Sequence, residues 1–255
     1  MKYNLILSLA VVVFYSCQTN PKQTEDQPLR SFPEEVSKVF EAHGGYDQWT
    51  EMSALSYAME NGEKQLISLK DRKVLIEGEE RTIGFDGNEV WVQPDTADAS
   101  RARFYHNLYF YFYAMPFVLG DSGISYEQLE PKEMQEEVLN GIKVSYGEAV
   151  GDSPDDNYIL WYDPGTYQMK WLMYTVTYGK DGASDRYSLI KYPEWTEVNG
   201  LKLPKKLQWH VYKNDSIGDV RGEALFTDVL INKEVPNAQL FEMPEDAQVA
   251  PGPEE

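Results

Sequence analysis

The chain has 255 residues, of which 42 are acidic and 23 basic, giving a formal net charge of −19. This charge disfavours binding to nucleic acid or to anionic lipid head groups, because both would repel it. The single cysteine, Cys17, excludes an internal disulfide and a zinc site built from several thiolates. A chain of this length can bury one large core, so one folded domain is expected.

The first 16 residues have the layout of a secretory signal. Lys2 supplies a charged start, Leu5–Tyr15 form an apolar run, and Ser16 is a small residue before a cleavage point. The run is too short to cross a bilayer comfortably, and a polar stretch follows it. We therefore expect residues 1–16 to be removed as a signal peptide.

Cys17 would then be the first residue of the mature chain, and the segment ending in Ser16-Cys17 resembles the lipobox of bacterial lipoproteins. Phe14 stands where Leu is commonest in that motif, and Tyr15 stands where a smaller residue is usual. The resemblance implies acyl chains on Cys17 that would anchor the protein at a membrane. The alternative is a free thiol within an ordinary signal peptide. Gln18, in place of the Asp that retains enteric lipoproteins at the inner membrane, favours the outer membrane, facing the periplasm.

Residues 17–30 have no apolar periodicity, which predicts a flexible tether after the lipidated Cys17. The folded domain is expected over residues 31–248, and a disordered acidic tail over residues 249–255.

The domain should open with an amphipathic helix. Ser31-Phe-Pro-Glu34 has the arrangement of a capping box, and Gly44-Gly45 can end the helix. Its apolar stripe would consist of Val36, Val39 and Phe40. A short turn capped by Asp47 would follow and place Trp49 and Met52 against the core.

Short β-prone runs separated by turn residues fill most of the remaining chain, and Asp86-Gly87 is a strong hairpin signal. The predicted strands are 55–60, 64–69, 72–77, 81–85, 89–93, 142–146, 158–162, 168–178, 186–192, 205–213 and 222–230. The pattern predicts a mainly β fold with few helices (α+β). We expect a curved antiparallel sheet of about 10–11 strands that forms an incomplete β-barrel, with helices as lid or plug.

Aromatic side chains crowd the segment 104–117, between the two groups of strands. A helix here, broken at Pro116, has no polar face to turn to water. It would either plug the barrel mouth or cover an apolar ligand cavity, and one helix can do both. For a ligand cavity, the expected binding residues are Phe104, Leu108, Phe112 and Met115 on one stripe, with Tyr109 and Trp91 nearby.

Three sequence motifs together resemble those of a known family. They are Ala42-His-Gly-Gly45 followed by Trp49, the hairpin Ile83–Trp91, and the aromatic segment. With them, roughly residues 33–245 look like an uncharacterised lipoprotein family of Bacteroidetes, similar in layout to the LolA/LolB-like lipoprotein carriers. The resemblance implies an opening helix, a curved half-barrel and lid helices around an apolar cavity that accepts acyl chains. Fold does not fix function, and no cargo-binding residue is carried over position by position.

The three histidines have no spacing typical of a metal site or a catalytic triad. His43 is expected at a helix C-terminus, where a cation is favoured. His106 is expected at the surface or against a ligand, and His210 as a bystander in a strand.

Acidic residues also give no clear site. Asp152, Asp155 and Asp156 could gather around calcium, but their spacing is not that of an EF-hand loop, and a solvated hairpin tip is the favoured interpretation. A carboxylate pair for a hydrolase needs two acidic side chains facing each other in a cleft, and 42 candidates make sequence separation uninformative. No metal, cofactor or catalytic residue is predicted.

The sequence favours a non-enzymatic, lipid-anchored envelope protein that binds or carries an apolar ligand. That ligand would be a lipid or the acyl chains of another lipoprotein. The alternative is a structural or interaction lipoprotein whose self-filled barrel docks a protein partner in the envelope. A carboxylate-dependent hydrolase is the third class.

Overall fold

A computed structural model of the protein describes residues 31–146, 156–177, 182 and 184–252. All described elements lie in one compact unit, Phe32–Glu255. The helices within the described ranges are α1 (Glu34–Ala42), α2 (Tyr46–Glu51), α3 (Ala102–Tyr105) and α4 (Leu108–Tyr113), with the 3₁₀ helices η1 (Phe117–Gly120) and η2 (Ala238–Phe241). The strands are β1 (Ala54–Met59), β2 (Lys64–Ser68), β3 (Val74–Glu77), β4 (Thr82–Phe85), β5 (Val90–Gln93), β6 (Ile124–Met134), β7 (Glu137–Tyr146), β8 (Asn157–Tyr162), β9 (Met169–Tyr174), β10 (Ser188–Val198), β11 (Leu201–Lys213), β12 (Ser216–Asn232) and β13 (Gln248–Val249).

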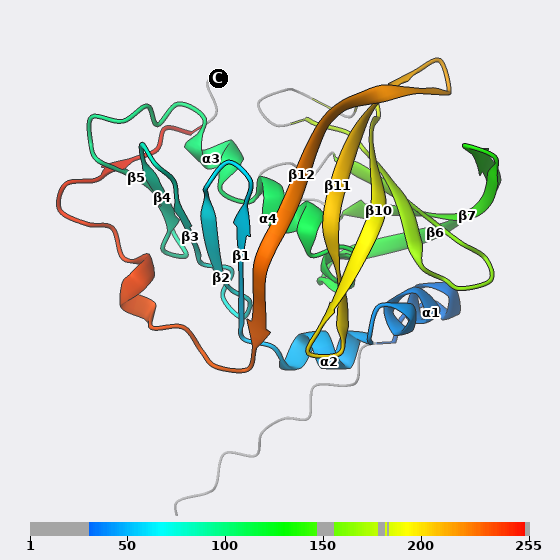
Figure 1. The fold of residues 1–255 in the computed structure, drawn as a ribbon, viewed down its shortest axis with the longest axis horizontal. Helices are drawn as coiled ribbons and strands as arrows, with labels where there is room; N and C mark the ends of the chain where they lie inside the picture. Colours follow the sequence, from blue (N-terminus) through cyan, green and yellow to red (C-terminus); the bar gives the residue numbers. More distant parts are fainter. Residues whose placement is uncertain (1–30, 147–155, 178–181, 183, 253–255) are drawn as a thin grey trace, which may run out of the picture. The chain divides into compact units, whose positions relative to one another are not determined.

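One antiparallel sheet contains the thirteen described strands, in the order β13-β5-β4-β3-β2-β1-β12-β11-β10-β9-β8-β7-β6. β1–β5 form one meander and β6–β12 another. The two meanders join where β1 pairs with β12, with Ala54 facing Asn232. The outer strands of the described sheet, β6 and β13, have one neighbour each, so the sheet is an open, curved half-barrel, as predicted (Figure 1).

The two faces of the sheet bury different side chains, because neighbouring residues of a strand point to opposite faces. In β8, Leu160 belongs to the main core, whereas Ile159 and Trp161 belong to a second cluster. The main core also contains side chains of α1, α2, α4 and η1. Figure 1 shows α4 inside the curve of the sheet and α1 and α2 across its lower end.

The aromatic segment consists of three short pieces, α3, α4 and η1, instead of one helix ending before Pro116. Its side chains from Phe112 to Leu119 are all buried. The Tyr192 hydroxyl donates to the Phe112 carbonyl (2.8 Å), and the Tyr113 ring lies 4.5 Å from that of Tyr57. This segment therefore fills the inside of the half-barrel.

The second cluster lies on the opposite, convex face. Its buried members are Met134, Leu139, Ile159, Trp161, Trp171, Met173 and Leu189. Two hairpin tips meet over it: Lys132 of β6 bonds to Asp215 in the β11–β12 turn and lies 6.0 Å from the centre of the Trp161 ring. This part of the sheet is therefore covered on both faces.

The C-terminal segment covers the convex face of the other meander. The Trp91 indole N–H donates to the carbonyl of Phe241 in η2 (3.0 Å). Gly84 leaves room for the indole, since a Cβ at this position would lie 2.0 Å from the Trp91 ring. β13 pairs with β5, and Ala250 is buried, so the sheet continues just past residue 248, the predicted end of the domain. The predicted signal, the predicted tether and residues 253–255 lie outside the described ranges.

The start of α1 differs from the prediction. Pro33 is the N-cap, and no side chain caps the helix, so the capping box with Ser31 is wrong. Gly44 and Gly45 do end α1, with φ of 107° and 95°. Gly45, not Asp47, is the N-cap of α2.

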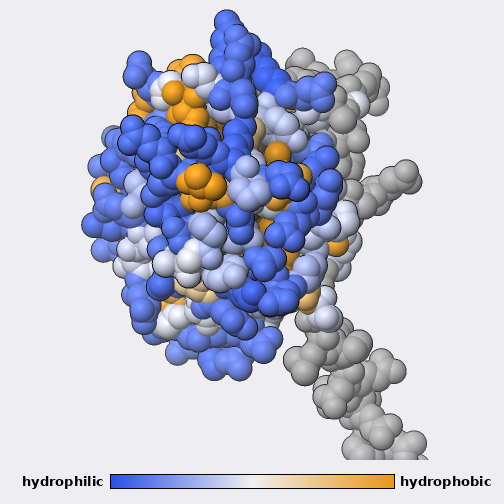
Figure 2. All heavy atoms as spheres, turned by 90° about the vertical axis from the view of Figure 1, so that its right-hand side faces the viewer, coloured by the Kyte–Doolittle hydropathy of each residue, from blue (hydrophilic) through white to orange (hydrophobic). Residues whose placement is uncertain are grey.

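Hydrophilic side chains cover most of the face shown in Figure 2, and apolar ones form small separate groups. Among the described residues, no helix combines the length and the apolar character needed to cross a membrane.

Candidate functional site

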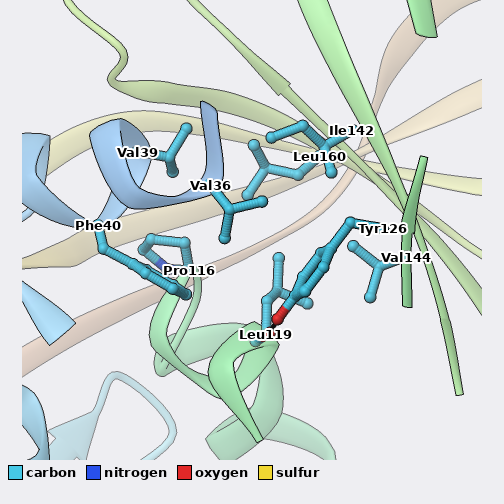
Figure 3. A pocket seen from close by; sticks show the side chains of 9 residues that line it. All are labelled: Val36, Val39, Phe40, Pro116, Leu119, Tyr126, Ile142, Val144 and Leu160. Atoms are coloured by element: carbon cyan, nitrogen blue, oxygen red, sulfur yellow. Dashed lines mark hydrogen bonds between the residues drawn. The ribbon is translucent and has the colours of Figure 1, made fainter. Parts of the chain in front are cut away.

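An apolar crevice lies between α1 and the inner face of β6–β8 (Figure 3). One wall is the apolar stripe of α1, the second is the chain around η1, and the third is formed by three neighbouring strands. The lining residues are Val36, Val39, Phe40, Pro116, Leu119, Tyr126, Ile142, Val144 and Leu160. We call this site the α1 crevice.

Local periodicity and strand register together build these walls. The stripe of α1 has the i, i+3, i+4 spacing that places side chains on one helix face. Ile142 and Val144 are two residues apart in β7 and so share a face of the sheet. In the register, Tyr126 of β6 faces Val144, and Leu160 of β8 faces Ile142.

The crevice is apolar and almost closed. Tyr126 is the only lining residue with a polar side-chain atom, and its hydroxyl donates to the Leu119 carbonyl. The lining side chains leave a space of about 10 Å³, which is roughly that of one water-sized sphere. An acyl chain is many times larger, so it requires a wall of the crevice to move.

Phe32, just before α1, closes the crevice with an aromatic cluster. Its ring packs edge-on against Phe40 (5.0 Å between ring centres), Tyr46 (4.8 Å) and Tyr126 (6.4 Å). The Tyr46 hydroxyl donates to the carbonyl of Gly120 at the end of η1 (2.8 Å).

Polar contacts hold the first turns of α1. The Tyr162 hydroxyl donates to the Glu35 carboxylate (2.7 Å), and burial, followed by this bond, raises the pKa of Tyr162. The Lys38 ammonium lies near the Glu34 carboxylate (2.7 Å) and the Tyr167 hydroxyl (3.4 Å). An ion pair as exposed as Lys38–Glu34 contributes little stability, so this pair holds the first turns of α1 only weakly.

His43 holds the other end of α1 inside the core. Its Nδ1–H donates to the Val39 carbonyl (2.7 Å), and its Nε2 accepts from the Met169 N–H (3.4 Å). The His43 carbonyl accepts from the Lys202 N–H (2.8 Å). Burial lowers the pKa of His43 to about 4, against the effect of the bond to Val39. His43 is therefore at the C-terminus of α1, as predicted, but burial favours its neutral form over the cation that the helix dipole favours.

The six residues predicted to bind a ligand lie in three places. Phe112 and Met115 are in the core, 4% and 0% exposed. Phe104, Leu108 and Tyr109 are half-buried on α3 and α4, with the Tyr109 ring edge-on to Trp209 (6.2 Å). Trp91 lies on the opposite face of the sheet, under η2. None of the six lines the α1 crevice, although Met115 directly precedes Pro116.

The other histidines are buried. His106 is 4% exposed and bonds to the Arg103 carbonyl, so its predicted surface position is wrong. His210 is 6% exposed and donates to the Gly218 carbonyl (2.9 Å).

The acidic candidates form no site that the structure describes. Asp152 and Asp155 lie outside the described residues, while Asp156 accepts from the Thr177 N–H (2.7 Å). The described residues contain no group of three or more side chains suited to holding a metal ion. Where the pKa of a carboxyl is shifted, it is lowered, as by the bond from Lys38 to Glu34. A general acid needs the opposite shift.

Sequence reasoning found the helix wall of the crevice but not the wall formed by β6. The alternation Ile124, Tyr126 and Gln128 was the available signal. Pro131 and the neighbouring charged residues interrupt it.

Comparison with known proteins finds one family model and several solved structures that are similar to the chain. Residues 89–215 match the family model described as Family of unknown function (DUF6503). No curated protein matches the chain. Among solved structures, it is similar to a LolA superfamily protein from Nitrosomonas europaea, with a TM-score of 0.45 and 10% identity over 74% of this chain and 87% of that one.

Two further structures are similar to the chain. One is a DUF1329 family protein from Desulfovibrio piger, with a TM-score of 0.47 and 11% identity over 82% of this chain and 98% of that one. The other, from Vibrio parahaemolyticus, is described as an outer membrane lipoprotein-sorting protein domain, with a TM-score of 0.42 and 6% identity over 81% and 94% of the two chains. The match to the family model agrees with the resemblance, predicted from the sequence, to a family of unknown function.

Proposed function

We propose that the protein is a non-enzymatic envelope protein that binds an apolar ligand, a lipid or the acyl chains of another lipoprotein, in the α1 crevice. The observation that carries this proposal is the lining, which consists of apolar side chains and one hydroxyl that is already bonded. Such a lining holds a ligand by removing apolar surface from water, with few polar contacts. The ligand would take the place of the α1 stripe against β6–β8.

α1 is the wall that would move. Its first turns are held by partly exposed polar contacts, whereas buried His43 holds its last turn. Opening at the first turns would break the Tyr162–Glu35 contact and leave the bonds of His43 intact. Of the six residues predicted to bind a ligand, Met115 stays in the proposal. It directly precedes the lining residue Pro116 and would support the wall of the crevice from behind.

The anchor is part of the same proposal. Acyl chains on Cys17 would hold the protein at the outer membrane, facing the periplasm, and the signal-like residues 1–16 support this placement. Growth with labelled palmitate should mark the wild-type chain and leave Cys17→Ser unlabelled. Equal labelling of the wild-type and Cys17→Ser proteins would contradict acylation at Cys17.

Ligand binding is tested with the mature chain carrying Cys17→Ser, purified without detergent. Native mass spectrometry and lipid extraction should find a bound acyl species, and a fluorescent acyl probe should bind saturably. Val36→Asp should abolish binding, because it places a carboxylate in the apolar wall. Ser37→Asp is the matched control, since it adds the same charge at the neighbouring, partly exposed position of α1. An empty protein that ignores added lipids would overturn the proposal.

A second function is favoured by the small volume of the crevice, about 10 Å³. A half-barrel filled by its own side chains suits a structural or interaction lipoprotein that docks an envelope partner through its acidic surface. In that case the probe would not bind, and cross-linking in intact cells would recover a protein partner.

A further inference from the structure

We propose that the α1 crevice selects acyl ligands with an uncharged head group over those with an anionic one, such as fatty acids. This inference rests on the proposed function and adds the class of ligand to it. An acyl chain seated under α1 must leave its head group at the rim of the crevice, so the charges of α1 decide which head group is accepted.

The crevice itself offers no group that binds an anion. Its lining contains no charged side chain, and the Tyr126 hydroxyl is engaged by the Leu119 carbonyl. Burying a carboxylate or phosphate there would remove its hydration without replacing it. An anionic head group must therefore find its partners at the rim.

The rim formed by α1 is negative. The helix carries Glu34, Glu35 and Glu41 but one cation, Lys38. The Lys38 ammonium lies 2.7 Å from a Glu34 oxygen and 3.5 Å from a Glu35 oxygen, so its charge is already balanced. The bond from Lys38 lowers the pKa of Glu34, which keeps this carboxyl ionised at neutral pH.

The remaining attractive groups at this end of α1 are also occupied. The N-terminus of a helix favours anions, but Glu34 and Glu35 already lie in its first turn. The Tyr162 hydroxyl, a donor beside the rim, bonds to Glu35. An incoming carboxylate would have to displace a carboxylate of the chain.

On the strand side, the described charged residues next to the lining point away from the crevice. Glu127 and Lys143 face each other in the register of β6 and β7, and each alternates with lining residues, so both lie on the opposite face of the sheet. Further away, the net charge of −19 repels anions in general. An uncharged head group, such as the glycerol of a monoacylglycerol, avoids these repulsions and can accept or donate hydrogen bonds at the rim.

The experiment uses the mature Cys17→Ser chain and displacement of a neutral fluorescent acyl probe. The competitors are 1-monolauroylglycerol and laurate, which have the same acyl chain, at pH 8 in 20 mM and 500 mM NaCl. At low salt, 1-monolauroylglycerol should bind more tightly than laurate. At high salt the difference between the two affinities should decrease, because the carboxylates of the protein are screened.

The double variant Glu34→Gln, Glu41→Gln removes two carboxylates of α1 and leaves the Tyr162–Glu35 contact in place. Each removed carboxylate at about 7 Å changes the affinity for an anion about threefold in water, so laurate should bind about tenfold more tightly at low salt. Affinity for 1-monolauroylglycerol should stay within about twofold. Glu79→Gln, in the turn between β3 and β4, is the control and should change neither.

Two results would count against the inference in different ways. Laurate that binds as tightly as 1-monolauroylglycerol at low salt, or that ignores the double variant, would overturn the selectivity and leave the proposed function standing. If neither competitor nor the probe binds, the proposed function itself fails.

Discussion

A histidine at the end of a helix ordinarily gains from being a cation, since the carbonyls there carry partial negative charge. His43 instead uses both ring nitrogens inside the core, one as a donor to Val39 and one as an acceptor from Met169. Both bonds need the neutral ring with its proton on Nδ1. Protonation would turn the acceptor into a donor that faces another N–H, so the attachment of α1 depends on a neutral His43.

Through His43 alone, we expect the free energy of unfolding to fall by about 2 kcal/mol between pH 7.5 and pH 5. The folded pKa of about 4 lies below the ordinary value of 6.5, so the unfolded chain takes up the proton first and acid favours unfolding. Urea denaturation at the two pH values measures the change. His43→Gln should be less stable at pH 7.5 yet lose about 2 kcal/mol less on acidification. Equal losses in the two proteins would contradict this role.

Gly84 is the second residue whose identity the packing requires. Gly84→Ala should lower the free energy of unfolding by about 3 kcal/mol, because the new Cβ would overlap the Trp91 ring, which η2 holds in place. Gly222→Ala in β12 is the matched control, since nothing lies within 4 Å of its Cβ, and it should change stability by less than about 1 kcal/mol. Urea denaturation followed by tryptophan fluorescence measures both. A small effect at both positions would mean that the indole has room to shift.

Among the elements, α1 combines one firm end with one weak end. The firm end is buried, and the weak end is held by contacts that water can replace. The described strand order contains no residue of α1, so the first turns of this nine-residue helix can move away without breaking the bonds between strands. The movement proposed for ligand entry is therefore local.

A reversible cross-link tests this movement. The Cys17→Ser chain contains no cysteine, so Glu35→Cys with Tyr162→Cys gives one pair across the contact between α1 and β8. A cleavable bis-thiosulfonate linker should hold α1 closed and slow binding of the acyl probe at least about tenfold, with full recovery on reduction. Each single variant treated with the same reagent is the control. A linked protein that binds as fast as the reduced one would show that α1 is not the wall that opens.

Most strands could be predicted from the sequence because their apolar residues alternate and turn residues separate them. β6 was missed for a physical reason: Tyr126 faces the crevice while Leu129, three residues later, packs against the convex cluster. The register shift between Leu129 and Lys132 then brings Met134 to the same face as Leu129. Its apolar residues therefore show no constant alternation. β13 has two residues, too few for any pattern.

The candidate site could be predicted only in part. The stripe of α1 follows from periodicity within one helix, but its opposing wall depends on which strands become neighbours. Trp91 is an example of a residue that could not be placed from the sequence. Alternation within β5 shows that its residues point to two faces, but it does not show which of these faces packs against the helices. The many aromatic residues near residue 110 correctly predicted a segment that is buried on most sides. The part of this segment that lines the crevice, however, is the chain around Pro116 and Leu119.

For the whole molecule, the excess of acidic over basic residues is the dominant electrostatic feature. Folding brings these charges closer together than they are in the unfolded chain. The folded state therefore carries a self-repulsion that dissolved salt reduces.

The melting temperature should accordingly rise by about 3 °C or more when NaCl increases from 20 mM to 500 mM at pH 8, because the Debye length then falls well below the spacing of most surface charges. Thermal denaturation followed by circular dichroism measures this. Choline chloride at the same ionic strength is the control for a specific effect of sodium. A melting temperature that stays constant or falls would mean that local ion pairs outweigh the general repulsion.

The pairing of β1 with β12 also bears on how the chain reaches its folded state. Ala54 of β1 pairs with Asn232 of β12. β1 can therefore gain this neighbouring strand only after nearly the whole polypeptide has been synthesised. Contacts between such distant residues form late and slow folding. For the export that we propose, a chain that has not yet been released lacks the strand that completes its sheet, and this would keep it unfolded during passage. A version truncated after β11 should remain unfolded by circular dichroism, and a stable fold without β12 would show that the order of assembly is different.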